Sequence, residues 1–341
     1  MADVARVADV SIATVSRALR GLPGVSDETR ERIRRTADEL SYVVSPAASG
    51  LSQRATRRVA VVVPRLDAWF QSTVLAAVEG TVRDAGVDVL VYQVDGETQR
   101  RRFFRDLPSR RKVDVVVLVA LPLLAEEESR LDLLGVEVIV AGGRLRDYPH
   151  VEVDDHALAR AATQHLLDLG HRRIGFVRTL DTPGAVWSSD VRRREGYADA
   201  LAAAGLPPSD ELVVSEPFGV RAGADGTARL LALPDPPTAV LCYSDEIAVS
   251  AFSELTRRGL SVPGDVSLVG IDGNPLAGLF AITSLQQPVA ELGRAAGEMA
   301  VRLMDGEPLG AERVEMPWTL VDRGSTGPPS GGGPAVGGAR G

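Results

Sequence analysis

The residues from Ser11 to Arg17 have side chains and spacing that suit contacts with DNA. Ile12, Ala13 and Thr14 begin a short predicted helix, and Arg17 follows about one turn later. An Arg side chain can donate two hydrogen bonds to a guanine, and a short apolar side chain can contact the methyl group of a thymine. A helix in the major groove presents its N-terminal residues to the base edges. These residues therefore point to double-stranded DNA as the first partner to consider.

Two short helices joined by a tight turn are predicted to position these side chains. Ser11 caps the helix that begins at Ile12, because its hydroxyl can accept a hydrogen bond from a free N–H group of the first turn. Asp9 interrupts the apolar pattern and falls in the turn. Apolar residues recur at helical spacing on two faces: Val4, Val7 and Ala8, then Val15, Ala18 and Leu19. The pattern indicates a helix-turn-helix. The alternative that Ile12 packs in the core is disfavoured, because Val15 and Leu19 already fill that face.

A third helix is predicted from Asp27 to Leu40, with Ser26 as its cap. Its inward face carries Ile33, Ala37 and Leu40. Its basic residues Arg30, Arg34 and Arg35 either contact the DNA backbone or lie on a solvated helix face, which is the commoner role of such charges.

Composition limits the class of protein. A chain of 341 residues suits two or three domains, and an apolar fraction of 45% indicates globular domains. The net charge is −8, but residues 1–58 hold ten Arg against seven Asp or Glu, a charge of +3 that leaves −11 for the remainder. A basic N-terminal region joined to an acidic body suits DNA contact at one end. The single cysteine, Cys242, and the lack of a long apolar run predict a cytoplasmic protein with no contact to a membrane.

From residue 59 onward the sequence predicts an α/β fold. Short β-branched runs alternate with stretches of helical length; the runs cover residues 59–64, 87–92, 113–120, 136–141, 173–177, 212–214, 238–243 and 265–271. Continuous apolar strands separated by helices are typical of parallel sheets covered on both faces. The pattern predicts two lobes of doubly wound parallel sheet, with a ligand cleft at the carboxyl ends of the strands. The chain is expected to cross between the lobes near residues 150–155 and 280–288.

The sequence DVARVADVSIATVSRALRG, followed by VSDETRERIRRTADELSY, closely resembles the headpiece of LacI/GalR (lac-repressor-type) transcription regulators. The similarity continues to about Arg323. It implies a three-helix headpiece, a hinge helix and a two-lobed sugar-binding core like that of periplasmic binding proteins. The implied base contacts are Ile12, Ala13 and Arg17, and the implied phosphate contacts are Ser11, Thr14 and Ser16. The chain departs from the family pattern at Asp9, where Gly is common, and at Met1, which already lies within the first helix.

The resemblance and the composition together define the expected domains. Residues 1–43 form the headpiece, 44–58 the hinge with its short helix, and 59–324 the core. The N-terminal lobe is expected to hold residues 59–152 and 281–288, and the C-terminal lobe 153–280 and 289–324. Residues 325–341 are rich in Gly and Pro and are expected to be disordered. This tail lacks leucine heptads, so a homodimer is favoured over a coiled-coil tetramer.

By resemblance, Leu51 of the hinge helix enters the minor groove of the DNA. An apolar side chain inserted between base steps costs a few kcal/mol of unstacking, which the added contacts of bent DNA offset. Ser49 and Gly50 give this helix low intrinsic stability, which suits an element that orders on binding. The alternative is that Leu51 is an ordinary linker residue.

The resemblance also implies a ligand site in the cleft. The segment RRREGYADAL supplies Arg193, and YSDEIAVSAF supplies Asp245. A carboxylate that accepts hydrogen bonds opposite an Arg that donates them suits a polyol, although a structural ion pair or a helix cap is the alternative for both residues. The full predicted set is Phe70, Arg193, Phe218, Asp245, Asp272 and Gln287. Core packing is the alternative for either Phe. Departures at residues 68–71, 244 and 273 leave the ligand unnamed.

Other classes of protein are less consistent with the sequence. It lacks a P-loop, a nucleophile elbow and a His/Cys cluster with metal spacing, so we expect neither an enzyme nor a bound cofactor. Asp154 and Asp155 are predicted to point to opposite faces of a strand rather than to act as paired acids. The prediction is a dimeric repressor that binds a palindromic operator under the control of a small carbohydrate effector. The alternatives are control by a protein corepressor and, less consistent with the headpiece, a solute-binding protein.

Overall fold

The structure is a computed structural model that describes residues 2–19, 23–39, 56–110, 113–131, 135–179, 188–207 and 209–330. The chain divides into two compact units, residues 1–56 and 57–341. The predicted hinge helix and Leu51 lie outside the described residues. Among the described residues, no helix is long and apolar enough to cross a membrane.

The N-terminal unit contains the predicted helix-turn-helix. Helices α1 (Ala2–Val7), α2 (Ile12–Leu19) and α3 (Asp27–Glu39) surround a small apolar core. That core consists of Val4, Ala5, Ala8, Val15, Ala18, Ile33 and Ala37. Ser11 Oγ accepts a hydrogen bond from Thr14 N at 3.1 Å, and Ser26 Oγ accepts one from Thr29 N at 3.3 Å, so both predicted caps are confirmed. The inward position predicted for Val7 is wrong, because this last residue of α1 is 50% exposed.

The N-terminal lobe of the core is built on a six-stranded parallel sheet with the order β11-β5-β4-β3-β1-β2. The strands are β1 (Arg58–Val63), β2 (Asp88–Gln93), β3 (Val115–Val119), β4 (Glu137–Ala141), β5 (His150–Glu152) and β11 (Arg313–Glu315). Its helices are α4 (Trp69–Asp84), α5 (Gly96–Arg110), α6 (Ala125–Leu131) and α12 (Val289–Met304). Strands β1, β3 and β4 are buried runs rich in Val, as expected where helices cover both faces of a parallel sheet, whereas no residue of the edge strand β2 is fully buried.

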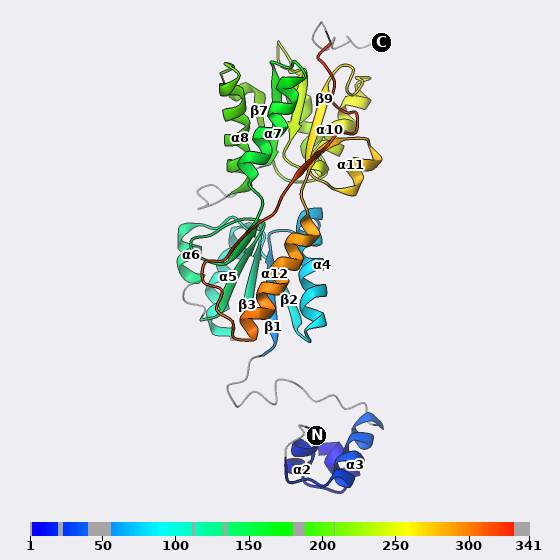
Figure 1. Cartoon of the computed structure of the whole chain (residues 1–341). Helices are drawn as coiled ribbons and strands as arrows, with labels where there is room; N and C mark the ends of the chain where they lie inside the picture. The colour runs from blue at the N-terminus through cyan, green and yellow to red at the C-terminus, as the bar shows by residue number, and fades with distance from the viewer. Residues whose placement is uncertain are drawn as a thin grey trace. The chain divides into compact units, whose positions relative to one another are not determined.

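The C-terminal lobe repeats the architecture with the strand order β12-β10-β9-β8-β6-β7, in which only the pair of β10 and β12 is antiparallel. The strands are β6 (Ile174–Thr179), β7 (Val213–Glu216), β8 (Ala239–Cys242), β9 (Ser267–Asp272), β10 (Thr283–Gln286) and β12 (Thr319–Val321). Its helices are α7 (Asp155–Asp168), α8 (Ser189–Ala203), α9 (Ala222–Leu231), α10 (Asp245–Arg257) and α11 (Pro275–Leu279), with a 3₁₀ turn at Asp210–Leu212. Figure 1 shows the two lobes and the segments that join them.

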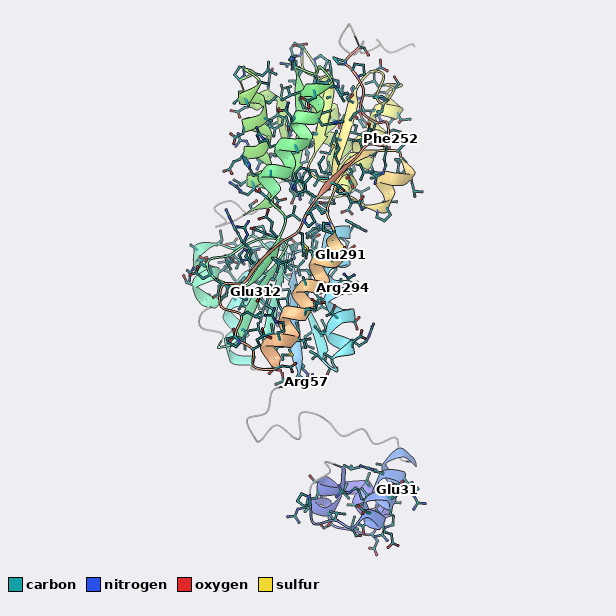
Figure 2. The ribbon with its side chains drawn as sticks, in the orientation of Figure 1. Glu31, Arg57, Phe252, Glu291, Arg294 and Glu312 are labelled. Atoms are coloured by element: carbon teal, nitrogen blue, oxygen red, sulfur yellow. The ribbon has the colours of Figure 1, made fainter. Side chains whose placement is uncertain are left out.

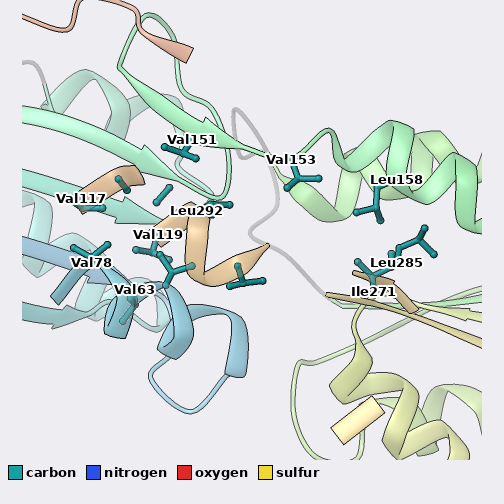
Figure 3. Close-up of a cluster of buried hydrophobic side chains, with 14 of the residues drawn as sticks. Val63, Val78, Val117, Val119, Val151, Val153, Leu158, Ile271, Leu285 and Leu292 are labelled. Carbon is teal, nitrogen blue, oxygen red and sulfur yellow. The ribbon is translucent and has the colours of Figure 1, made fainter. Parts of the chain in front are cut away.

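The predicted assignment of the last segments to the lobes is wrong. Strand β10 pairs with β9 and belongs to the C-terminal lobe, whereas α12 packs on α4 and belongs to the N-terminal lobe. Gly293 permits this packing, because a Cβ atom there would lie 2.7 Å from Val74 O. Leu292 lies among the valines of the N-terminal lobe (Figure 3), while Glu291 and Arg294 are exposed (Figure 2). The chain therefore crosses between the lobes a third time, near residues 316–318, before it enters β12.

The disorder predicted from residue 325 does not hold for residues 325–330. Ser325 is 3% exposed; its Oγ accepts a hydrogen bond from Thr283 N at 2.8 Å and donates one to Leu268 O at 2.5 Å. His171 Nε2 lies 2.8 Å from Gly327 O. Polar contacts of this kind order a segment that lacks a hydrophobic period, so composition alone does not reveal them. Residues 331–341 lie outside the described part of the chain.

Candidate functional sites for DNA and ligand

The exposed face of α2 carries the residues predicted to contact DNA bases. Ile12 is 54% exposed, and Ala13 and Arg17 are also exposed, whereas Val15 and Ala18 are buried on the opposite face. The alternative that Ile12 packs in the core is therefore wrong. The predicted phosphate contacts lie beside this face: Ser11 is exposed, and Thr14 and Ser16 are half-buried. The geometry leaves the first turn of α2 open to a major groove.

A cavity of about 1000 Å³ lies where the carboxyl ends of the two sheets meet, and residues of both lobes line it. The N-terminal lobe contributes the segments that follow β1, β2, β3 and β4, and the C-terminal lobe contributes the first turns of α7, α8 and α10. This is the position predicted for a ligand cleft in parallel sheets. Five of the six predicted ligand residues line it: Phe70, Arg193, Phe218, Asp272 and Gln287.

Arg193 is the centre of a buried polar network in the cavity wall. It is 4% exposed; its Nε donates to Asp155 Oδ1 at 2.7 Å and its Nη1 donates to Tyr243 O at 2.5 Å. Its guanidinium lies over the Tyr243 ring, 4.5 Å from the centroid, and its Nη2 is 3.6 Å from Asp272 Oδ1. Burial opposes the charge, but Asp155, Tyr243 and Asp272 raise the pKa of Arg193 above its ordinary value. The network therefore places one permanently charged guanidinium beside two carboxyl groups.

Asp272 and Gln287 form a second contact in the same wall. Gln287 Nε2 donates to Asp272 Oδ1 at 2.8 Å, and Gln287 N donates to Asp272 O at 3.1 Å. Asp272 has a φ of 113°, which L-residues rarely adopt, at the end of β9. Burial raises the pKa of Asp272 well above its ordinary value. The two residues thus fix the position of a carboxylate at the end of a strand.

Asp245, also predicted to bind ligand, is buried behind the cavity wall instead. It is fully buried, and its Oδ2 accepts hydrogen bonds from Gly273 N at 2.7 Å, Asn274 N at 2.7 Å and Ser284 Oγ at 2.9 Å. These contacts tie the first turn of α10 to the loop that follows β9. Burial raises the pKa of Asp245 to about 6, although those three donors lower it. These contacts favour a structural role, the alternative that the sequence left open, and the neighbouring Glu246 lines the cavity.

The two predicted aromatic residues take different environments. Phe70, at the start of α4, approaches Gly142 so closely that a Cβ atom at Gly142 would lie 2.9 Å from the Phe70 ring. Gly142 therefore makes room for the ring at the cavity surface. Phe218 lies on the opposite lobe, with the guanidinium of Arg65 5.3 Å from its centroid. Both residues are half-buried, and both line the cavity.

Several residues that line the cavity escaped prediction. Asp155 and Glu246 stand in the first turns of α7 and α10, and Arg100 forms a buried ion pair with Glu127 in the N-terminal lobe. The prediction that the Asp154–Asp155 pair lies on a strand is wrong: Asp154 caps α7 by accepting from the backbone N–H groups of residues 156 and 157. An acidic pair directly after a strand is a helix-cap signal that could have identified this position.

The fold and these two surfaces define a class of protein: a DNA-binding regulator that joins a helix-turn-helix unit to a two-lobed core. Residues 1–45 match the family of bacterial regulatory proteins of the lacI type, and residues 163–326 match the periplasmic binding protein-like domain. The chain is 32% identical over 330 residues to the HTH-type transcriptional repressor CytR of Escherichia coli strain K12, with 96% of each chain covered. The chain belongs to the LacI family of transcriptional regulators, which bind DNA and are not enzymes.

Solved structures agree with this assignment. A transcriptional regulator CelR–cellobiose complex is similar with a TM-score of 0.70 and 31% identity, covering 95% of this chain and 98% of the other. The lac repressor dimer bound to operator and the anti-inducer ONPF has a TM-score of 0.79 at 23% identity, which supports the fold alone; 95% of this chain and 98% of that one are covered.

Proposed function

We propose that this protein is a repressor that binds a palindromic operator as a homodimer and that a small carbohydrate or carbohydrate derivative controls its affinity for DNA. The effector binds in the cavity between the lobes. Since operator DNA is the target, the protein acts in the cytoplasm. The observation that carries the ligand half of this proposal is the buried network around Arg193, which places one guanidinium and two carboxylates in the wall of a cavity of about 1000 Å³.

The chemistry of that wall suits a ligand with several hydroxyl groups. Asp155 and Asp272 accept hydrogen bonds, the amide of Gln287 donates and accepts them, and the rings of Phe70 and Phe218 suit the apolar face of a sugar. The similar CelR regulator was solved in complex with cellobiose. The volume of the cavity lies within the range of pockets that enclose small ligands.

The DNA half of the proposal assigns direct base contacts to Ile12, Ala13 and Arg17. Ser11, Thr14 and Ser16 are assigned to phosphates, and Leu51 to the minor groove. A twofold-symmetric dimer places two such helices on two half-sites, so the operator is expected to be close to palindromic. Ligand changes the relative orientation of the lobes and, through the hinge, the affinity for DNA, a coupling of about 1–3 kcal/mol.

An apolar patch on the C-terminal lobe supports the dimer. Leu276 is 44% exposed, Leu279 is 80% exposed and Phe280 is 41% exposed, all on or directly after α11. The Phe280 ring lies 5.7 Å from that of Phe252 on α10, which Figure 2 labels on this lobe. Exposed apolar residues that cluster in this way mark interaction surfaces. The occupant we propose is the same patch of a second copy.

The first experiment is a thermal-shift panel of monosaccharides, disaccharides, sugar phosphates and nucleosides with the purified full-length protein. A ligand at 100 times its dissociation constant stabilises a protein by about 2.7 kcal/mol, which shifts the melting temperature measurably. A carbohydrate that stabilises the wild type, but not a variant with Arg193→Ala, supports the cavity as a sensor. A silent panel with a protein that is folded and binds DNA contradicts the carbohydrate proposal and favours a protein corepressor.

A further inference from the structure

We infer that the cavity selects an effector without negative charge, so that phosphorylated sugars and nucleotides are rejected in favour of neutral polyols. This inference rests on the proposed function, because it specifies the class of ligand that the same cavity binds. Seven carboxylate and five guanidinium side chains line the cavity among the described residues. The excess of carboxylates and the contacts of the guanidinium groups both disfavour an anion.

The C-terminal wall contains more acids than bases. Asp155 is 7% exposed, Asp272 is 5% exposed and Glu246 is half-buried, while Arg193 is the base that faces them. Burial raises the pKa of each of the three carboxyl groups. Proton uptake would reduce the negative charge of this wall, but it would supply no cation. An anion that left water for this wall would therefore lose hydration and find a single cation, Arg193, which Asp155 and Asp272 already engage.

The arginines of the N-terminal wall are already paired with carboxylates. Arg100 is 8% exposed; its Nε and Nη2 donate to the two oxygens of Glu127 at 2.9 and 2.5 Å, and its Nη2 also donates to Pro122 O at 2.6 Å. Arg101 pairs with Glu97 at 2.9 Å. An anion would have to compete with these internal acids for each guanidinium.

Arg65 and Arg130 complete the set of lining arginines. Arg65 donates to both oxygens of Asp67, at 3.0 and 2.7 Å. Arg130 is exposed in the last turn of α6, a helix whose first turn carries three glutamates. Arg65 is thus already paired with a carboxylate, and Arg130 is not buried. Neither residue provides an anion with a buried, unpaired cation.

The helix N-termini that meet at the cavity also disfavour an anion. Free N–H groups at such ends bind phosphates in many proteins. Here the first turn of each of three helices contributes acidic residues to the cavity lining: Glu126 and Glu127 on α6, Asp155 on α7 and Glu246 on α10. The side chain of Glu127 accepts from Leu124 N, and Asp154 accepts from the first N–H groups of α7. The ends of α6 and α7 therefore already interact with carboxylates of the protein, and the end of α10 is capped by the hydroxyl of Ser244.

The test compares matched ligands that differ by one phosphate. Isothermal titration of the full-length protein uses glucose against glucose 6-phosphate and cellobiose against its 6-phosphate, and the thermal panel adds inorganic pyrophosphate as a bare anion. We expect each phosphorylated probe to bind at least about tenfold more weakly than its neutral counterpart, from repulsion by nearby carboxylates. If pyrophosphate raises the melting temperature at all, the increase should be the same in the wild type and in the Arg193→Ala variant.

Variants identify the source of the discrimination. Glu246→Gln removes one charge from the wall but keeps an oxygen that can accept a hydrogen bond. The ratio of the affinity for the neutral probe to that for the phosphorylated probe should therefore fall several-fold. Glu254→Gln, on the same helix but outside the cavity, is the matched control and should leave the ratio unchanged. Equal or tighter binding of a phosphorylated probe overturns the inference while leaving a carbohydrate sensor in place. Pyrophosphate stabilisation that depends on Arg193 also overturns it. If no sugar binds, neutral or phosphorylated, both the carbohydrate proposal and this selectivity fail.

Discussion

Glu246 in the C-terminal lobe accepts a hydrogen bond from the backbone N–H of Trp69 in the N-terminal lobe, with a distance of 3.2 Å between Oε2 and N. The bond joins the first turn of α10 to the first residue of α4. Arg65 and Phe218 make a second contact between the lobes, 5.3 Å from guanidinium carbon to ring centroid. Both contacts border the cavity, so a ligand that changes the angle between the lobes must change them.

Glu246→Ala should therefore widen the range of interlobe angles. The variant removes the acceptor of the Trp69 N–H group, an interaction of about 1 kcal/mol. Distances between spin labels on the two lobes should broaden in the absence of ligand. Glu246→Gln retains an acceptor oxygen and should behave like the wild type. Identical distance distributions in all three proteins would show that this bond does not hold the lobes.

Arg17→Ala should abolish preference for the operator sequence while leaving some nonspecific binding that weakens with salt. Loss of a bidentate contact with a guanine costs about 1–3 kcal/mol of discrimination, whereas phosphate contacts do not depend on sequence. Selection of binding sites from random DNA measures the effect. Arg32→Ala, an exposed position on α3, is the control. An unchanged selected sequence would refute the role of Arg17.

Leu51→Ala should weaken operator binding and reduce the bend of the DNA. The smaller side chain cannot unstack a base step, so the contacts that depend on bending are lost. Gel mobility of circularly permuted operator fragments reports the bend angle. An unaltered angle would return Leu51 to the role of an ordinary linker residue.

Leu279→Asp should shift the protein from dimer to monomer. The substitution would bury a charge in the proposed interface, which is costly without a partner. Sedimentation equilibrium measures the dissociation constant of the dimer. Val191→Asp is the matched control, since Val191 is 47% exposed on α8, at the other side of the same lobe from α11 (Figure 1). A dimer constant that matches the wild type would place the interface elsewhere.

Asp245 should make the protein less stable as the pH rises to about 6. Its pKa is raised from 3.8 to about 6 in the folded state. Between these values the folded protein holds a proton that the unfolded chain releases, so the free energy of unfolding falls with rising pH and the penalty is complete above about pH 6. Asp155 and Asp272 act in the same direction, so the difference between wild type and Asp245→Asn isolates one group. Equal slopes of unfolding free energy against pH in both proteins would contradict the assignment.

Local sequence signals were sufficient to predict those helices and strands whose formation depends on residues close together in the chain. Ser11 and Ser26 predicted their helices because a cap acts within one turn, and the runs of Val and Ile predicted eight of the strands. The short strands β5, β10, β11 and β12 were not predicted, because none of them contains a run of three consecutive apolar residues. Their pairing depends on partners far away in the chain.

The ligand site shows the same limit. The position of Arg193 at the cavity could be predicted because its segment resembles that of a known family. The position of Asp245 behind the cavity wall depends on the loop at Gly273 and Asn274, which the sequence does not place against α10. Glu246 could not be predicted from its own segment, because a polar residue in the first turn of a helix is common. Its contact with Trp69 joins residues that are far apart in the chain.

Because the chain crosses between the lobes three times, neither lobe can be exchanged as one continuous segment of the gene. Neither lobe is encoded by one continuous stretch: the last strand of each sheet, β11 and β12, comes from residues 313–321, after the main segments of both. A chimera that exchanges one lobe with a relative therefore needs three splice points, near residues 153, 287 and 317. A premature stop codon before residue 313 would remove an edge strand from both lobes at once.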